Sequence, residues 1–267
     1  MIADVSQTGR IVIIRAKTLD VNAYLILQKD HTIAIDSLLL PRDSQELANI
    51  AASYGKPVKY LINTHFHSDH CLGNHFLKQP QTTQINQEDY WNTIVREKAM
   101  INPKRHKPVE QRKLTKPEIT FKDEYLLDDI LLLSTPGHSP DSICIYLPAE
   151  KTLISGDTIL NTCSGRYSLP YFFWGSANDL IASLQKLLTL DINTIYSGHG
   201  FPLIKTDKIT SDLTYLQSLI NQVNKYQSQS LSSDELAQKI TISDCLNSSE
   251  TPAVPQVHKL NIQQLRI

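Results

Sequence analysis

The chain has 267 residues, of which 41% are hydrophobic and 20% are charged, and its formal net charge is −1. This composition is ordinary for a globular protein, and the near-neutral charge argues against a nucleic acid or an anionic membrane as partner. No apolar stretch approaches the ~20 residues that span a bilayer, and the first residues lack the pattern of a signal peptide. The 4 cysteines have no CxxC spacing. We therefore expect a cytoplasmic protein that binds neither nucleic acid nor membranes.

The first half of the chain opens with three short β-rich runs separated by turn-forming residues, which indicates an antiparallel meander. These runs are 11–14, 23–27 and 32–35. A helix is predicted from Pro41 to Gly55, because apolar residues recur there at helical spacing and glycine stops the pattern. The apolar run 58–62 then indicates a buried strand.

The segment 79–117 is polar and basic, with helical character in residues 88–100. A segment of this kind between better-defined elements is either a flap over a site or a surface insertion. The sequence leaves both interpretations open.

The second half repeats the order of strands followed by helices. Strands are predicted at 118–121, 130–133, 142–147, 152–154 and 194–196, and helices at 180–190, 207–226 and 233–239. We expect a single domain over 1–267, in which residues 205–267 supply C-terminal helices and a proline-containing tail. The order suggests two similar αβ halves packed sheet to sheet with helices outside.

Potential metal ligands are concentrated in the stretch NTHFHSDHCLGN, residues 63–74, directly after the strand predicted at 58–62. His65, His67, Asp69 and His70 lie within six positions of one another. Imidazoles and a carboxylate so close together suit a divalent transition metal, with zinc as the first choice. The sequence therefore predicts a metal site on the loop that leaves this strand.

Three further potential ligands share another pattern, an apolar strand followed by glycine and then the ligand. They are His138 in TPGHS, Asp157 in SGDT and His199 in SGHG. Glycine lets the backbone turn sharply at the strand end. The seven donors exceed the four that one structural zinc needs, which favours two adjacent metals with one bridging carboxylate. Such a centre supplies hydroxide near neutral pH and polarises a carbonyl or phosphoryl oxygen.

The order HxHxDH followed by glycine-preceded His, Asp and His resembles the metallo-β-lactamase superfamily. The resemblance runs through VNAYLI, NTHFHSDH, PGHSPDS, SGDTI and SGHG, and the segment His258–Asn261 is similar to the HxxN segment with which many members end. It implies an α/β fold, the metallo-β-lactamase αββα sandwich, with two mixed β-sheets packed face to face and helices outside.

The resemblance also implies roles for the seven donors. The first metal would be held by His65, His67 and His138. The second would be held by Asp69, His70 and His199, with Asp157 bridging both. Asp69 would be catalytic as well, because it would orient the nucleophile or pass its proton to the leaving group. Two zinc ions are implied, with iron or manganese as alternatives.

The run GDTILNTCSGRYSLP resembles glyoxalase II-like hydrolases and places Arg166 on their basic residue. A guanidinium there would hold a substrate carboxylate or thiol-carrier group, although a surface or structural arginine is the alternative. Three aromatic residues are further candidates for a substrate pocket, with core packing as the alternative: Tyr167, Tyr171 and Trp174. Leu160 stands where lactonases of this fold often have tyrosine.

These observations predict a dinuclear zinc-dependent hydrolase that acts on a small ester-type substrate, with a thioester as the first choice. A lactonase, a β-lactamase or a phosphodiesterase on the same site is the alternative within hydrolases. A mononuclear iron persulfide dioxygenase is the alternative from another class of enzyme. A small molecule is the expected partner, and the sequence leaves a monomer and a homodimer both open.

Overall fold

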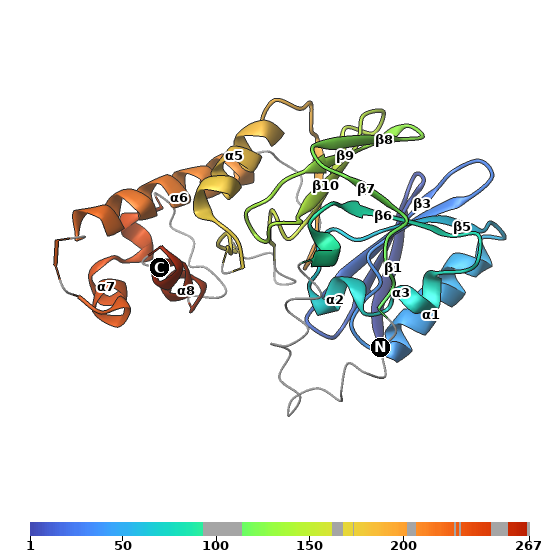
Figure 1. The fold of residues 1–267 in the computed structure, drawn as a ribbon, viewed down its shortest axis with the longest axis horizontal. Coiled ribbons are helices and arrows are strands. Elements are labelled where there is room, and N and C mark those ends of the chain that lie inside the picture. Colours follow the sequence, from blue (N-terminus) through green and yellow to red (C-terminus); the bar gives the residue numbers. More distant parts are fainter. Residues whose placement is uncertain are drawn as a thin grey trace. The chain divides into compact units, whose positions relative to one another are not determined.

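A computed structural model gives the fold of the chain. It describes residues 1–92, 114–161, 168–172, 174–201, 207–226, 228–229, 231–246 and 256–265. The chain forms two units, Met1–Tyr125 (unit 1) and Leu126–Ile267 (unit 2), whose elements are labelled in Figure 1. The assignment of residues 1–267 to one domain stays a prediction. No helix among these described ranges is long and apolar enough to cross a membrane.

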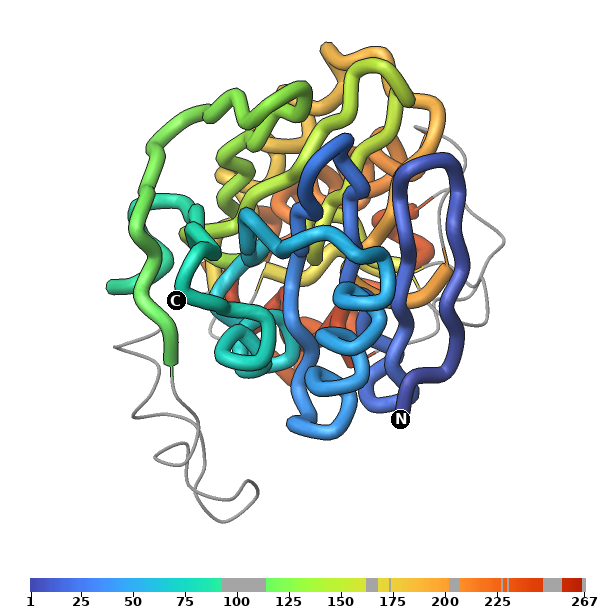
Figure 2. The backbone as a smooth tube through the Cα atoms, turned by 90° about the vertical axis from the view of Figure 1, so that its right-hand side faces the viewer, coloured from blue at the N-terminus to red at the C-terminus, as the bar shows by residue number. Residues whose placement is uncertain are grey.

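Unit 1 is built on a seven-stranded sheet whose strands follow one another in chain order. The strands are β1 (Ile2–Thr8), β2 (Ile11–Ala16), β3 (Asn22–Leu27), β4 (Thr32–Ile35), β5 (Val58–Ile62), β6 (Thr83–Gln87) and β7 (Ile119–Phe121). The first four are antiparallel neighbours, which confirms the predicted meander, and their blue trace can be followed from the N-terminus in Figure 2. From β4 to β7 each pair is parallel.

Two strands of this sheet were not predicted, because neither carries an apolar pattern. Most side chains of the edge strand β1 are exposed. In β6 the polar side chains are buried and bond to one another, and Gln84 Nε2 donates to Asn86 Oδ1 at 2.9 Å. Residues 83–87 of the segment 79–117 thus belong to the sheet. Residues 93–113 lie outside the described residues, so the flap stays a prediction.

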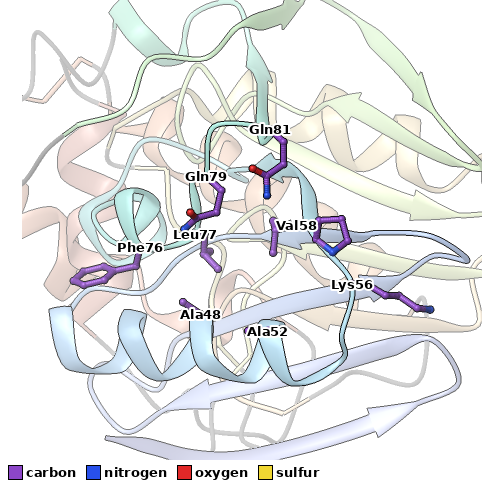
Figure 3. A pocket seen from close by; sticks show the side chains of 9 residues that line it. Ala48, Ala52, Lys56, Val58, Phe76, Leu77, Gln79 and Gln81 are labelled. Atoms are coloured by element: carbon purple, nitrogen blue, oxygen red, sulfur yellow. The ribbon is translucent and has the colours of Figure 1, made fainter.

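Helix α1 (Pro41–Ser53) contributes an apolar face to the core of unit 1. Proline stands in its first turn, and the chain turns at Gly55, whose φ is +67°, as the sequence predicts. Its residues Leu47 and Ala51 are buried in one cluster with Leu61 of β5. Figure 3 shows a small pocket beside this cluster, lined by side chains of α1, of β5 and of the short helix α3 (Asn74–Leu77).

Unit 2 is built on a five-stranded sheet with the order β12-β11-β10-β9-β8. Its strands are β8 (Glu124–Leu127), β9 (Ile130–Ser134), β10 (Ile143–Leu147), β11 (Thr152–Gly156) and β12 (Thr194–Ser197). Strands β9, β10 and β11 are antiparallel neighbours, whereas β11 and β12 are parallel. The predicted hairpin and the predicted strand after it are therefore confirmed.

The helices of unit 2 are α5 (Ala177–Leu187), α6 (Asp207–Lys225), α7 (Ser233–Lys239) and α8 (Gln256–Gln264). Helix α5 begins three residues before its predicted start, because Ser176 caps it and accepts a hydrogen bond from the Asp179 N–H. Helix α8 lies where the sequence predicts only a tail. Its buried residues are His258, Asn261 and Ile262, so two of the three positions that face the protein are polar and give no amphipathic pattern.

Helix α6 carries a buried ion pair one turn after its start. Lys208 Nζ donates to Asp212 Oδ1, and the two side chains are 8% and 0% exposed. Burial lowers the pKa of Lys208, while the neighbouring carboxylate acts in the opposite direction. The adjacent helix residues Ile209 and Leu213 belong to the apolar cluster of unit 2.

Removing one partner of this pair should destabilise the fold strongly. Asp212→Ala leaves the Lys208 ammonium in an apolar setting, so we expect a loss of about 3–5 kcal/mol in the free energy of unfolding. The double variant Lys208→Met/Asp212→Leu should come close to the original stability, because no charge stays buried. Urea unfolding of both variants checks this, and equal losses in the two would contradict it.

Candidate metal centre

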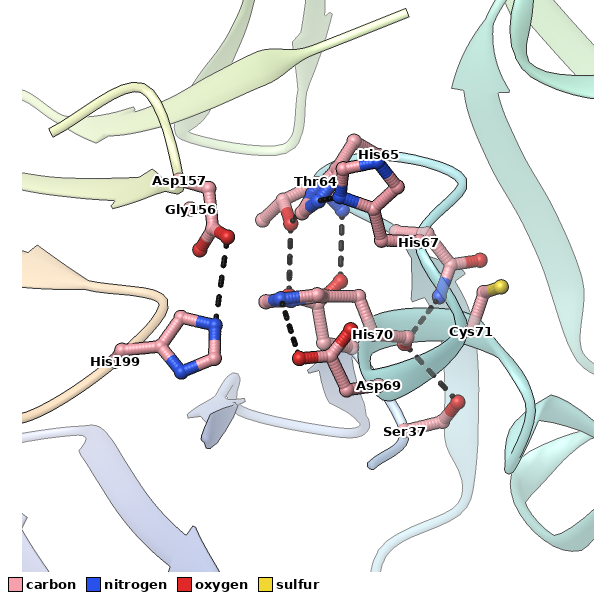
Figure 4. A network of polar contacts seen from close by, with 12 residues as sticks. Ser37, Thr64, His65, His67, Asp69, His70, Cys71, Gly156, Asp157 and His199 are labelled. Atoms are coloured by element: carbon pink, nitrogen blue, oxygen red, sulfur yellow. Dashed lines mark hydrogen bonds and ion pairs between the residues drawn. The ribbon is translucent and has the colours of Figure 1, made fainter. Parts of the chain in front are cut away.

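The loop from Asn63 to Asn74 is held in place by amide and hydroxyl side chains. Asn74 Nδ2 donates to Asn63 Oδ1 at 2.8 Å, and Asn63 Nδ2 donates to the His70 carbonyl at 3.0 Å. The same carbonyl accepts the Ser37 N–H at 2.8 Å, and Figure 4 shows Ser37 beside it. A Cβ at Gly73 would lie 2.0 Å from the Ser37 carbonyl oxygen, so the close approach requires glycine. These contacts hold the backbone of the loop in place.

His70 is oriented by a buried carboxylate at the end of β4. His70 lies on the one-turn helix α2 (Ser68–Cys71), and its Nδ1 is 2.8 Å from Asp36 Oδ2. Asp36 also accepts the Thr64 N–H at 2.7 Å and the Thr64 hydroxyl at 2.8 Å. Burial raises the pKa of Asp36, and the bonds from His70 and Thr64 act against that rise. With Nδ1 engaged, the Nε2 atom of His70 faces Asp69, 3.8 Å from its Oδ2.

The other two imidazoles of the loop lie edge to face. His65 Nε2 is 2.9 Å from His67 Nδ1, and His65 Nδ1 is 3.1 Å from the Thr64 hydroxyl. His65 is 1% exposed, whereas His67 and Asp69 are half-buried. We call His65, His67, Asp69 and His70 the unit 1 donor group.

In unit 2 the carboxylate of Asp157 lies between two imidazoles. Its Oδ2 is 3.6 Å from His138 Nε2 and 3.4 Å from His199 Nε2, and Figure 4 shows the second of these contacts. Asp157 follows β11 and His199 follows the parallel neighbour β12, so adjacent strand ends bring them together. We call His138, Asp157 and His199 the unit 2 donor group.

The arrangement in unit 2 fits metal ligation better than hydrogen bonding. Distances of 3.4 and 3.6 Å are too long for good N–H···O bonds. Two donors on a tetrahedral zinc stand about 3.3 Å apart when each bond is about 2.0–2.1 Å long. His138 Nδ1 is 2.7 Å from the Tyr171 carbonyl oxygen, which only accepts, so the ring proton stays on Nδ1. The lone pair of His138 Nε2 therefore faces Asp157.

The predicted substrate residues are placed less fully. Arg166 and Tyr167 lie outside the described residues. Tyr171 and Trp174 are half-buried, and burial raises the pKa of the Tyr171 phenol. Their neighbour Phe172 is fully buried in the core of unit 2. Part of the aromatic run thus packs in the core, and the backbone of Tyr171 serves the donor group.

Sequence reasoning missed Asp36 and Thr64 as members of this site. Asp36 directly follows an apolar strand, much as Asp157 does. However, no glycine precedes Asp36, and it lies far from the histidines in sequence. Its φ of +59° lies in the left-handed region, which few residues other than glycine adopt and in which aspartate is enriched. The aspartate that directly follows the apolar run 32–35 is the sequence signal that pointed to this position.

Asp36→Ala should weaken metal binding without touching a predicted ligand. His70 loses the acceptor for Nδ1, so we expect metal affinity to fall by about 10- to 100-fold. Competition with a chromophoric zinc chelator measures this change. Asp20→Ala is a matched control, because it removes the carboxylate of the half-buried Arg15–Asp20 pair elsewhere in unit 1. Unchanged affinity in Asp36→Ala would contradict the orienting role.

Comparison with known proteins places these donors in a family. The sequence model of the Metallo-beta-lactamase superfamily matches residues 16–199, a range that contains both donor groups. A hydroxyacylglutathione hydrolase of Brucella anthropi is 27% identical over 67% of this chain and 61% of its own length. A beta-lactamase-like protein 2 homolog of Caenorhabditis elegans is 28% identical over 61% of this chain and 48% of its own. The chain thus spans about half to three fifths of these curated relatives.

Solved structures give the same fold at low identity. A metallo beta lactamase from Hirschia baltica is 15% identical, with a TM-score of 0.64 over 80% of this chain and 96% of its own. An inverting sec-alkylsulfatase from Pseudomonas sp. is 15% identical, with a TM-score of 0.77 over 98% of this chain and 49% of its own. The predicted fold class, two mixed β-sheets with helices, is confirmed. From the family match and this fold, the chain belongs to the metallo-β-lactamase superfamily.

Proposed function

We propose that the protein is a zinc-dependent hydrolase with a dinuclear centre and that Asp157 is the bridging ligand. The observation that carries this proposal is the position of Asp157 Oδ2 between the Nε2 atoms of His138 and His199. A carboxylate in this position would lie between two cations held by the neighbouring imidazoles and would lower the repulsion between them. One structural zinc would not need so many donors.

The two donor groups together would complete the centre. In this proposal the first zinc takes His65, His67 and His138, and the second takes Asp69, His70 and His199. The family match supports the assignment, because it spans all seven residues in one alignment. Iron or manganese in the same positions is the alternative that metal analysis distinguishes.

The chemistry of the proposal divides between the metals and the side chains. When bound, two zinc ions make a coordinated water acidic enough to ionise near neutral pH and polarise a carbonyl oxygen. Asp69 is a half-buried carboxylate, so it would accept a hydrogen bond from the attacking water and would then carry a proton to the leaving group. Asp36 keeps the proton of His70 on Nδ1.

A thioester is the proposed substrate class, and cleavage would release a carboxylate and a thiol. The relatives named hydroxyacylglutathione hydrolase support this choice. Leu160 offers no hydroxyl where lactonases of this fold often have tyrosine, which places lactones behind thioesters. β-Lactams and phosphodiesters follow. Three cysteines, Cys71, Cys144 and Cys245, are free and buried, which suits the reducing cytoplasm that we propose as its location.

The first prediction of this proposal is thiol release from a panel of glutathione and coenzyme A thioesters. Zinc-loaded protein should release thiol at a rate that a chelator abolishes and added zinc restores. His138→Ala should remove nearly all turnover, because it empties the first zinc position. Ser183→Ala is its control, since Ser183 bonds to the Pro136 carbonyl two residues before the ligand without reaching the donors.

Two results would redirect the proposal. Metal-loaded protein that releases no thiol but opens lactones or β-lactams would keep the dinuclear hydrolase and replace the substrate. Purification with iron, together with oxygen consumption on a persulfide, would replace the hydrolase with a dioxygenase.

A second prediction concerns Asp157. Asp157→Ala should lower the metal content from about two ions per chain toward one, because the bridging ligand is lost. Elemental analysis of the purified variant measures the content. Asp191→Ala is the matched control, since this exposed carboxylate of unit 2 pairs with the exposed Lys151. Full occupancy and full rate in Asp157→Ala would overturn the bridging assignment.

A further inference from the structure

Helix α8 presents polar side chains to the interior of unit 2. His258 and Asn261 are 5% and 0% exposed, and their spacing of three residues places them on one face of the helix. Buried polar groups are costly unless each is hydrogen-bonded. The hydrogen-bond partners of these two side chains therefore show which parts of unit 2 the helix holds in place.

Both N–H groups of the Asn261 amide are engaged. Asn261 Nδ2 donates to the Pro170 carbonyl at 2.8 Å and to the Tyr215 hydroxyl at 3.2 Å. The Tyr215 hydroxyl in turn lies 2.9 Å from His258 Nδ1, and His258 Nε2 lies 2.8 Å from the Ile240 carbonyl. Since that carbonyl only accepts, His258 carries its proton on Nε2 and accepts the tyrosine proton at Nδ1.

Burial keeps this pattern in one protonation state. Desolvation lowers the pKa of His258, with the Ile240 carbonyl acting against that change. Desolvation also raises the pKa of Tyr215 far above its ordinary value, so the phenol stays protonated. The direction of each hydrogen bond from Asn261 to Ile240 is therefore fixed, and the Asn261 amide has one orientation.

The far end of this network reaches the segment that orients His138. Pro170, which accepts from Asn261, is followed directly by Tyr171, whose carbonyl holds His138 Nδ1 at 2.7 Å. Peptide units are planar, so once the Pro170 carbonyl is fixed only the φ and ψ angles of Tyr171 determine where the next carbonyl points. Asn261 is thus one peptide unit from the acceptor that sets the His138 ring.

A second contact of α8 is with Gly175, which packs against the residue before His138. Gln264 Nε2 lies 3.4 Å from the Gly175 carbonyl oxygen. Gly175 packs so closely that a Cβ there would lie 2.0 Å from the Gly137 carbonyl oxygen, which also accepts the Ser176 N–H at 3.0 Å. The backbone on the N-terminal side of His138 is therefore held by a segment that α8 contacts as well.

We propose that Asn261, supported by Tyr215 and His258, is a positioning residue for the metal ligand His138. It acts through the Pro170 and Tyr171 carbonyls and keeps His138 Nε2 directed at the metal. This inference rests on the proposed function, because it requires His138 to bind metal. The HxxN-like segment His258–Asn261 would thus raise metal affinity through this chain of hydrogen bonds.

The test compares zinc affinity with thermal stability in full-length variants. Asn261→Asp keeps the shape of the side chain but replaces both N–H donors with acceptors. We expect the zinc affinity of the site that contains His138 to fall by about tenfold relative to the original protein, as for other residues that orient a ligand. Chelator competition measures this change. Tyr215→Phe leaves the bond to Pro170 and should cause a smaller loss in the same direction. It also keeps the inference testable if Asn261→Asp does not fold.

The control separates positioning from stability. Tyr146→Phe also removes a buried side-chain bond to a carbonyl in unit 2, the 2.9 Å contact with Asp191, at the opposite end of its strand from the donors. It should lower the melting temperature without changing zinc affinity. Unchanged affinity in Asn261→Asp, with the original protein binding two zinc ions, would overturn the positioning role alone. An original protein that binds no zinc would overturn both this inference and the proposed function.

Discussion

A neutral imidazole carries a proton on one ring nitrogen and an available lone pair on the other. The hydrogen bond that the protonated nitrogen donates decides which nitrogen has the lone pair. In this protein that decision is made at Nδ1, by the Asp36 carboxylate for His70 and by the Tyr171 carbonyl for His138. Each ring is thereby fixed with Nε2 toward a carboxylate of its own donor group. Thr64 donates two hydrogen bonds to Asp36, and we propose that the polar face of α8 supports the Tyr171 carbonyl.

The two units solve the same positioning problem in the same way. In unit 1 the parallel strands β4 and β5 end at Asp36 and at the loop that carries His65. In unit 2 the parallel strands β11 and β12 end at Asp157 and at His199. Carboxyl ends of adjacent parallel strands lie at the same sheet edge, so donors far apart in sequence become neighbours. The sheet of unit 1 has three antiparallel and three parallel strand pairs, and in each unit a parallel pair ends at residues of the candidate site.

The sequence predicts ligands more readily than it predicts what orients them. His65, His67 and His138 stand in short motifs whose spacing is visible without a structure. Asp36 and Asn261 act across long sequence separations, and their effect depends on burial and on hydrogen-bond direction, which no local pattern contains. The same reason explains the missed strand β6 and helix α8, whose buried faces carry glutamine, asparagine and histidine where periodicity analysis looks for apolar side chains.

Helix α8 also has a consequence for how the protein is made. The Pro170 carbonyl accepts its hydrogen bond from Asn261, which is synthesised 91 residues later in the chain. At about 5–20 residues per second, synthesis of the intervening chain takes roughly 5–20 seconds, during which the segment beside His138 lacks its final support. A nascent chain therefore passes through a period in which the segment beside His138 has been made but the side chain that binds its carbonyl has not. The metal site that we propose at His138 is therefore complete only after α8 has been synthesised.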